Sequence, residues 1–179
     1  MDYSEIIRFW FEEIESKLWW VKDESFDHLL RDRFGEVHCA ARAGELYAWR
    51  DDPAGRLAEV IVLDQFSRNM FRDTAGAFAW DAMALVLSQT AVAIGVDQHL
   101  EPRQRAFLYM PYMHSESPLI HEIAVNLFSQ PGLENNLEFE NKHKAIIDRF
   151  GRYPHRNQVL GRTSTAEETA FLMQPGSSF

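Results

Sequence analysis

Apolar residues recur every three or four positions along most of the chain, which is the spacing of one face of an α-helix. The first two series are Ile6, Trp10, Ile14 and Leu18, then Phe26, Leu30, Phe34, Val37 and Ala41. No segment of strand length alternates convincingly between apolar and polar residues, and no Asn-Gly or Asp-Gly hairpin turn occurs. The pattern therefore predicts an all-α protein.

Proline, glycine and capping residues mark where the predicted helices begin and end. Helix starts are expected at Asp2 with Glu5, at Asp52-Pro53, Glu101-Pro102 and Ser117-Pro118, and at Ser164 with Glu167. Helix ends are expected at Gly44, Gly95, the turn 130–132, Gly151 and Pro175. Pro111 should break or kink the helix that starts at Pro102, because proline removes a backbone donor.

These boundaries predict seven or eight helices joined by short connections. A chain of 179 residues fits one domain with one core. We expect a single all-helical domain over residues 1–179, with helices packed as antiparallel pairs in a tetratricopeptide-like array. Residues 175–179 are expected to form a short disordered tail.

The net charge and the composition limit the kinds of partner that this protein is expected to bind. The net charge is −9, so the overall field repels nucleic acid and anionic membranes, and neither is expected as a partner. Cys39 is the only cysteine, which excludes an internal disulfide and a four-thiolate zinc site. The acidic N-terminus is unlike a signal peptide, and the apolar stretch 82–96 is shorter than a membrane span. We expect a cytoplasmic protein without a cofactor, and a homodimer is left open.

The stretch from His143 to Arg162 concentrates positive charge in this acidic protein. Its cations are Lys144, Arg149, Arg152, Arg156 and Arg162, against one acid, Asp148. Gly151 and Pro154 could fold the chain so that several guanidinium groups reach one point and bind a carboxylate or phosphate. The same arginines could instead pair with acids on other helices and hold the fold together. Both interpretations stay open.

A second polar group follows Pro111. His114 and Glu116 could act as a general base and the carboxylate that orients it, and His155 is an alternative base. Alternatively, Glu116 pairs with an arginine and a serine caps the next helix. A metal site built from these residues with His143 is disfavoured, because their spacing is not that of a helical metal motif and arginines lie nearby. No metal is expected.

Aromatic residues cluster near the N-terminus. Trp19 and Trp20 are adjacent, so they cannot both face the core from one helix. One of them is a candidate to line a groove.

Several of these motifs together resemble a bacterial domain family of unknown function with a tetratricopeptide-like, all-helical fold. The resemblance rests on IRFWF at 7–11, WWVKDESF at 19–26, VLDQFSRNMFR at 62–72, RAFLYMPYMHSE at 105–116, 143–162 and 163–172. Tyr153 stands where the family usually has Phe, and His121 where it has Gln. The resemblance implies the fold and no established activity. The family motifs mark the following polar residues as candidate site residues: Asp64, Gln65, Arg68, Asn69, Arg72, His114, Glu116, His143, Arg152, His155, Arg156, Asn157 and Arg162.

The leading hypothesis is a groove lined by Arg, His and Asn that binds a small anionic molecule or an acidic peptide end. Its ligand-binding residues would be Asp64, Gln65, Arg68, Asn69, Arg72, His143, Arg152, Arg156, Asn157 and Arg162. The second hypothesis is an enzyme with hydrolase-like acid–base chemistry at His114, Glu116 or His155. The third is a tetratricopeptide-like module that binds a partner protein.

Overall fold

The computed structural model describes residues 2–177 and is helical throughout, with no strand in that range. The α-helices are α1 (Tyr3–Arg8), α2 (Glu24–Arg42), α3 (Pro53–Ile61), α4 (Ser67–Met70), α5 (Asp81–Ala93), α6 (Pro102–Met113), α7 (Pro118–Phe128), α8 (Glu134–Phe150) and α9 (Ala166–Leu172). Two π-helical segments (Phe9–Glu13, Val62–Phe66) and five 3-10 segments (Ser16–Trp19, Tyr47–Asp51, Ala75–Phe78, Val96–His99, Pro154–Arg156) complete them. The predicted all-α class is confirmed, whereas the tetratricopeptide-like order of the helices stays a prediction.

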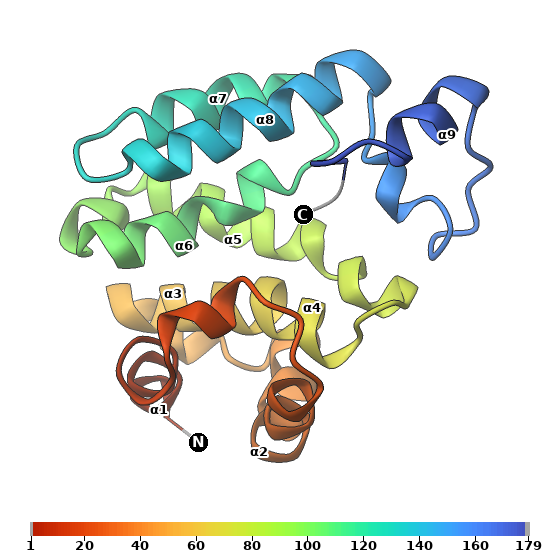
Figure 1. The fold of residues 1–179 in the computed structure, drawn as a ribbon. Helices are drawn as coiled ribbons and strands as arrows, with labels where there is room; N and C mark the ends of the chain where they lie inside the picture. The colour runs from red at the N-terminus through yellow and green to blue at the C-terminus, as the bar shows by residue number, and fades with distance from the viewer. Residues whose placement is uncertain (1, 178–179) are drawn as a thin grey trace.

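The helices lie in successive layers (Figure 1). α7 and α8 pack side by side at one end, α5 and α6 lie beneath them, then α3 and α4, and α1 and α2 form the opposite end. The segment after α8 turns back along the side of these layers and carries α9. This return brings Arg156 close to the start of α5 and the end of α6.

Aromatic and branched side chains fill the main core. Trp10, Phe9 and Phe66 are essentially fully buried and contact one another edge-on or tilted. A smaller cluster of Ile146, Ile147 and Tyr153 lies under the returning segment. The buried tyrosine fixes the position of that segment against α8.

Several predicted boundaries agree with the structure. Asp52 caps α3 by accepting from Ala54 N–H at 2.8 Å, and Glu101 with Gln104 forms a capping box before α6. Gly95 and Gly151 adopt left-handed backbone angles, with φ of 74° and 67°, directly after the helices they end.

Three predicted details are wrong. The first helix does not continue to Leu18, because the chain is extended at Ile14 and folds back so that the Trp19 indole donates to the Trp10 carbonyl at 3.1 Å. Asp2 precedes α1 but makes no side-chain cap. Pro111 does not break α6, which continues to Met113 through a buried segment, while the alternative of a kink stays a prediction.

The capping box of the last helix lies one residue later than predicted. Thr165 Oγ1 accepts from Glu168 N–H at 3.1 Å, and Glu168 accepts from Thr165 N–H at 2.7 Å. Both Ser164–Glu167 and Thr165–Glu168 have capping-box spacing, and the structure uses the pair whose glutamate is buried. Of the predicted tail, 178–179 lie outside the described residues, while Ser177 Oγ donates to the Leu172 carbonyl at 3.2 Å.

One stretch, Ala75–Ala93, is long and apolar enough to cross a membrane by length and composition alone. Single helices in the cores of soluble proteins also satisfy this criterion.

Candidate functional site

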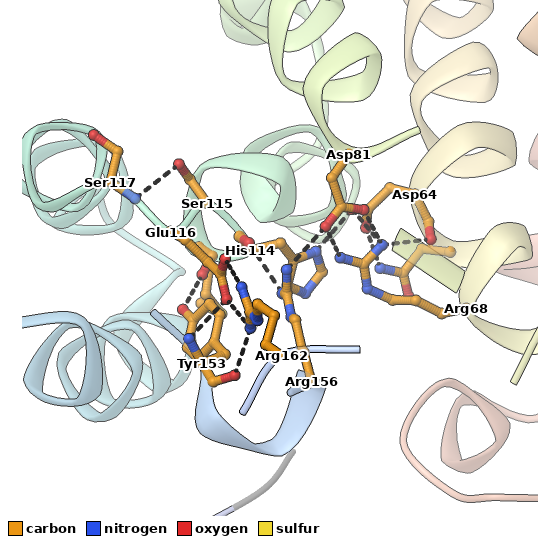
Figure 2. A network of polar contacts seen from close by, with 12 residues as sticks. Asp64, Arg68, Asp81, His114, Ser115, Glu116, Ser117, Tyr153, Arg156 and Arg162 are labelled. Atoms are coloured by element: carbon orange, nitrogen blue, oxygen red, sulfur yellow. Dashed lines mark hydrogen bonds and ion pairs between the residues drawn. The ribbon is translucent and has the colours of Figure 1, made fainter. Parts of the chain in front are cut away.

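Asp64 is the buried centre of a polar network that joins α4, α5, α6 and the returning segment (Figure 2). Its Oδ1 lies 2.8 Å from His114 Nδ1 and 2.9 Å from Arg68 Nη1, while Gln65 Nε2 donates to Oδ2 at 2.6 Å. Burial alone would raise the pKa of Asp64, but the charges of Arg68 and His114 and the donated hydrogen bonds lower it. Asp64 is therefore a carboxylate.

The π-helical segment Val62–Phe66 places Asp64 in the interior, and α4 continues from it without a break. Arg68, one turn later, also donates to the Asp64 carbonyl at 2.8 Å. π-helical insertions of this kind often coincide with functional sites.

Asp81, at the start of α5, joins two arginines. Arg68 Nη1 lies 3.0 Å from Asp81 Oδ1, and Arg156 Nη1 donates to Asp81 Oδ2 at 3.1 Å. Arg156 Nη2 donates to the His114 carbonyl at 3.0 Å. Its guanidinium lies between the rings of Phe78 and Tyr153, at 4.5 and 4.6 Å from their centroids. The fold thus brings Asp81 and Arg156 into contact, although they are 75 positions apart in the sequence.

The guanidinium of Arg156 is buried and only partly hydrogen-bonded. Burial lowers the pKa of Arg156, and the like charge of Arg68 lowers it further, against the opposing effect of Asp81. Arg156 is 6% exposed, and its Nε has no hydrogen-bond partner within residues 2–177. Arg68 also pairs with Asp64, so two arginines face two carboxylates, and what Arg156 retains is an unpaired donor that a further acceptor could satisfy.

A cavity of about 340 Å³ opens beside this network. Its lining residues are Phe78, Ala79, Asp81, Ala82, Leu85, Pro111, His114, Ser115, Glu116, Arg156 and Leu160. Apolar walls with a few convergent polar groups are typical of small-molecule sites, and the volume lies in their usual range.

His114 lies at the cavity wall with its ring orientation fixed. Asp64, as a carboxylate, accepts the Nδ1–H, which leaves Nε2 as the basic nitrogen. Burial and the charge of Arg68 lower the pKa of His114, although Asp64 opposes them. The imidazole is therefore neutral at neutral pH, as a general base requires. The carboxylate that contacts His114 is Asp64, rather than Glu116 as the sequence hypothesis had it.

Glu116 instead anchors the returning segment. Arg162 donates to it bidentately, at 2.6 and 2.9 Å, and Tyr153 N–H donates to Oε1 at 2.8 Å. Burial would raise the pKa of Glu116, but these donors together lower it. The alternative interpretation in which Glu116 pairs with an arginine is the one that the structure contains.

Two other predicted arginine ligands are held in ion pairs away from the cavity. Arg72 donates bidentately to Asp27 at 2.6 and 2.8 Å. Arg152 donates bidentately to Glu168, also at 2.6 and 2.8 Å. Neither lines the cavity, and of the five arginines predicted as ligand-binding residues only Arg156 does.

The asparagines and two of the histidines that were predicted as site residues lie outside the cavity. Asn69 donates to the Gln65 carbonyl, and Asn157 accepts from Arg162 Nε at 2.9 Å. His143 Nδ1 lies 2.8 Å from the Phe139 carbonyl, and burial lowers its pKa to about 3. Burial, helped by Arg156, lowers the pKa of His155 to about 4. None of these four side chains lines the cavity.

Two residues of the network were missed from the sequence. Asp81 lies in none of the motifs identified in the sequence, and the tertiary fold places it next to Arg68 and Arg156. His121, identified from the sequence only as a departure from the family, is fully buried: Nδ1 lies 2.7 Å from Glu140 Oε1 and Nε2 lies 2.8 Å from the Ser115 carbonyl. Its spacing from the buried Ala124 and Phe128 on α7 was the available signal.

Across the described range, no group of three or more His, Cys, Asp or Glu side chains is arranged to hold a metal ion.

Comparison with known proteins gives the same architecture and no activity. A bacterial protein family of unknown function (DUF924) matches residues 6–176. A solved structure of a protein of unknown function from Agrobacterium tumefaciens has 37% sequence identity and a TM-score of 0.90, with 96% of each chain covered. No curated protein matches the chain.

Proposed function

The chain belongs to a bacterial family of unknown function (DUF924), and from the geometry of its cavity we propose that it binds a small anionic molecule beside Arg156. The observation that carries the proposal is the buried guanidinium of Arg156, whose Nε has no hydrogen-bond partner within residues 2–177, at the wall of a cavity of about 340 Å³. The rings of Phe78 and Tyr153 both pack against the guanidinium, with centroids 4.5 and 4.6 Å away. Such a fixed guanidinium loses little side-chain entropy when it pairs with a ligand.

The residues that line the cavity also limit the chemistry and size of the ligand. Phe78, Ala82 and Leu85 offer apolar contact, so the anionic group would extend from a short apolar body. Asp81 already accepts from both arginines, and Glu116 is neutralised by Arg162, so the acids of the wall do not outweigh Arg156. An acidic peptide end is the less favoured ligand, because the cavity has the volume of a small molecule.

The proposal is tested by thermal unfolding with sodium acetate, pyruvate, succinate, sulfate and phosphate at constant ionic strength. An anion at about 100 times its dissociation constant should stabilise by about 2.7 kcal/mol, or roughly 5–10 °C for a chain of this size. Arg156→Ala should abolish the shift. Arg152→Ala is the matched control, since Arg152 pairs with Glu168 and does not line the cavity.

The binding proposal is wrong if none of these anions stabilises the wild type. It is equally wrong if Arg156→Ala, shown to be folded by circular dichroism, responds as the wild type does.

A second candidate function is general-base hydrolysis, and the Asp64–His114 contact favours it. His114 Nε2 would take a proton from water as the resulting hydroxide adds to a carbonyl, and would return that proton to the leaving group. Asp64 would hold the Nδ1–H throughout. Binding of an anionic substrate beside Arg156 would place its reactive carbonyl near His114.

Hydrolysis of p-nitrophenyl succinate, whose free carboxylate suits Arg156, tests this candidate. His114→Gln should reduce the rate by about 10²-fold or more. His155→Gln, a histidine outside the cavity, should leave the rate nearly unchanged. A wild-type rate no higher than that of His114→Gln would exclude this chemistry for such esters without touching the binding proposal, which anion stabilisation decides separately.

A further inference from the structure

A second cavity, of about 560 Å³, lies on another part of the molecule. It is bounded by the 3-10 segment Ser16–Trp19, the start of α6, and the connection between α7 and α8. Trp19, Trp20, Arg103, Phe107 and Met110 are among its lining residues. Met110 also contacts the Asp64 network, because Gln65 Nε2 donates to its Sδ at 3.2 Å.

Aromatic rings form one wall of this cavity. Trp20 is 62% exposed, and its ring is stacked with that of Phe107 at 6.0 Å with an interplanar angle of 16°. Trp19 meets Phe107 edge-on at 4.9 Å. The backbone extension at Ile14 turns both tryptophans toward α6, although their adjacency predicted that only one would line a groove. An exposed tryptophan beside an apolar cavity suits a planar ring, which gains stacking contact.

The polar rim carries the guanidinium of Arg103 and, apart from it, the carboxylate of Glu101. Arg103 makes one hydrogen bond within residues 2–177, from Nη2 to the Phe11 carbonyl at 3.2 Å, and its guanidinium lies 5.7 Å from the Trp19 ring centroid. Its other N–H groups are available. Glu101, in contrast, caps α6 by accepting from the Gln104 N–H. The positive end of α6 and the Asn136 amide add further donors to this rim.

We propose that this second cavity binds a small planar aromatic carboxylate. Its ring stacks against Trp20 and contacts Met110, and its carboxylate accepts hydrogen bonds from Arg103. The proposal stands independently of the Arg156 site, because the two cavities share no lining residue.

Isothermal titration calorimetry with 1-naphthoate tests the proposal. The uncharged 1-naphthamide reports the ring contribution alone, and cyclohexanecarboxylate reports the charge with a non-planar ring. The wild type should bind 1-naphthoate at least about tenfold more tightly than either. Indole N–H resonances of Trp19 and Trp20 should shift in the NMR spectrum on titration, while that of Trp80 should not.

Variants separate the two contributions. Trp20→Ala should weaken 1-naphthoate binding about tenfold, and Arg103→Gln should weaken 1-naphthoate but not 1-naphthamide. Tyr47→Ala and Arg42→Gln, an exposed aromatic and an exposed arginine elsewhere, are the matched controls and should bind as the wild type. Arg156→Ala should also keep its affinity for 1-naphthoate.

The assignment is overturned if 1-naphthoate does not bind the wild type, or if it binds Trp20→Ala and Arg103→Gln unchanged. Equal affinity for cyclohexanecarboxylate would overturn the requirement for a planar ring. Loss of 1-naphthoate binding in Arg156→Ala alone would place the ligand in the first cavity and overturn the second site.

Discussion

The carboxylate of Asp64 holds the imidazole of His114 at 2.8 Å across 50 residues of sequence. Asp64 comes from a π-helical segment and His114 from the residue that follows α6. Through this contact the buried polar network reaches the wall of the cavity. The stability of the protein and the protonation of its candidate base therefore depend on the same carboxylate.

We expect Asp64→Asn to destabilise the protein by about 3–5 kcal/mol at pH 7, because it leaves Arg68 and its neighbours without a buried counter-charge. Urea unfolding measures this cost. Asp148→Asn is the control: Asp148 is half exposed and pairs with Lys144, so its loss should cost less than about 1 kcal/mol.

The cost of Asp64→Asn should also depend on pH. Since the folded pKa of Asp64 is lowered, its stabilisation is present above the ordinary value of 3.8 and is lost as pH falls below it. The difference between wild type and variant should shrink below pH 3.8. A difference that grows on acidification would contradict the role assigned to this carboxylate.

His155→Gln should weaken the acid sensitivity of the fold. Burial lowers the folded pKa of His155 to about 4, from 6.5, so the neutral ring stabilises above pH 6.5 and this contribution is lost between pH 6.5 and 4. Chemical denaturation at several pH values should show a flatter profile for the variant across that window. His28→Gln, at an exposed site, should keep the wild-type profile.

Arg162→Ala should lower both stability and anion affinity, although Arg162 does not line the first cavity. It removes the bidentate partner of the partly buried Glu116, which costs about 1–3 kcal/mol. It also frees the segment that carries Arg156. Arg149→Ala, which breaks an exposed pair with Glu167, should leave both nearly unchanged. Unaltered anion binding by Arg162→Ala would show that Glu116 does not position Arg156.

Two glycine substitutions should have opposite effects. A Cβ at Gly55 would lie 2.0 Å from the Trp49 carbonyl oxygen, so Gly55→Ala should destabilise by about 3 kcal/mol through backbone displacement. Gly35, inside α2, has no atom within 4 Å of the corresponding position. Gly35→Ala should therefore stabilise by about 0.5–1 kcal/mol. Thermal unfolding of the two variants reports both signs, and similar effects of the two would contradict the close approach at Gly55.

The predicted boundaries that agree with the structure depend on local chemistry. Asp52-Pro53 and Gly151 act on backbone groups within a few residues, so their roles follow from the sequence around them. Where two local solutions competed, as at Ser164 and Thr165, packing selected between them: Glu168 also pairs with Arg152.

The candidate site was only partly predictable from the sequence, because contacts between distant segments decide which side chains reach it. Arg152 and Arg156 lie four residues apart in one basic run, yet Arg152 pairs with Glu168 while Arg156 reaches Asp81 and the cavity. Their sequence neighbourhoods do not distinguish them. The acidic residues that other helices place nearby decide which arginine keeps an unpaired hydrogen-bond donor.

The sequence by itself determined the helical class and most helix boundaries, because periodicity and capping act over short distances. Only the tertiary structure decided that Asp64 orients His114, that Glu116 anchors the returning segment, and that Trp19 and Trp20 face a cavity. Each of these contacts joins distant segments, and their energies depend on burial and charge compensation that no local pattern records.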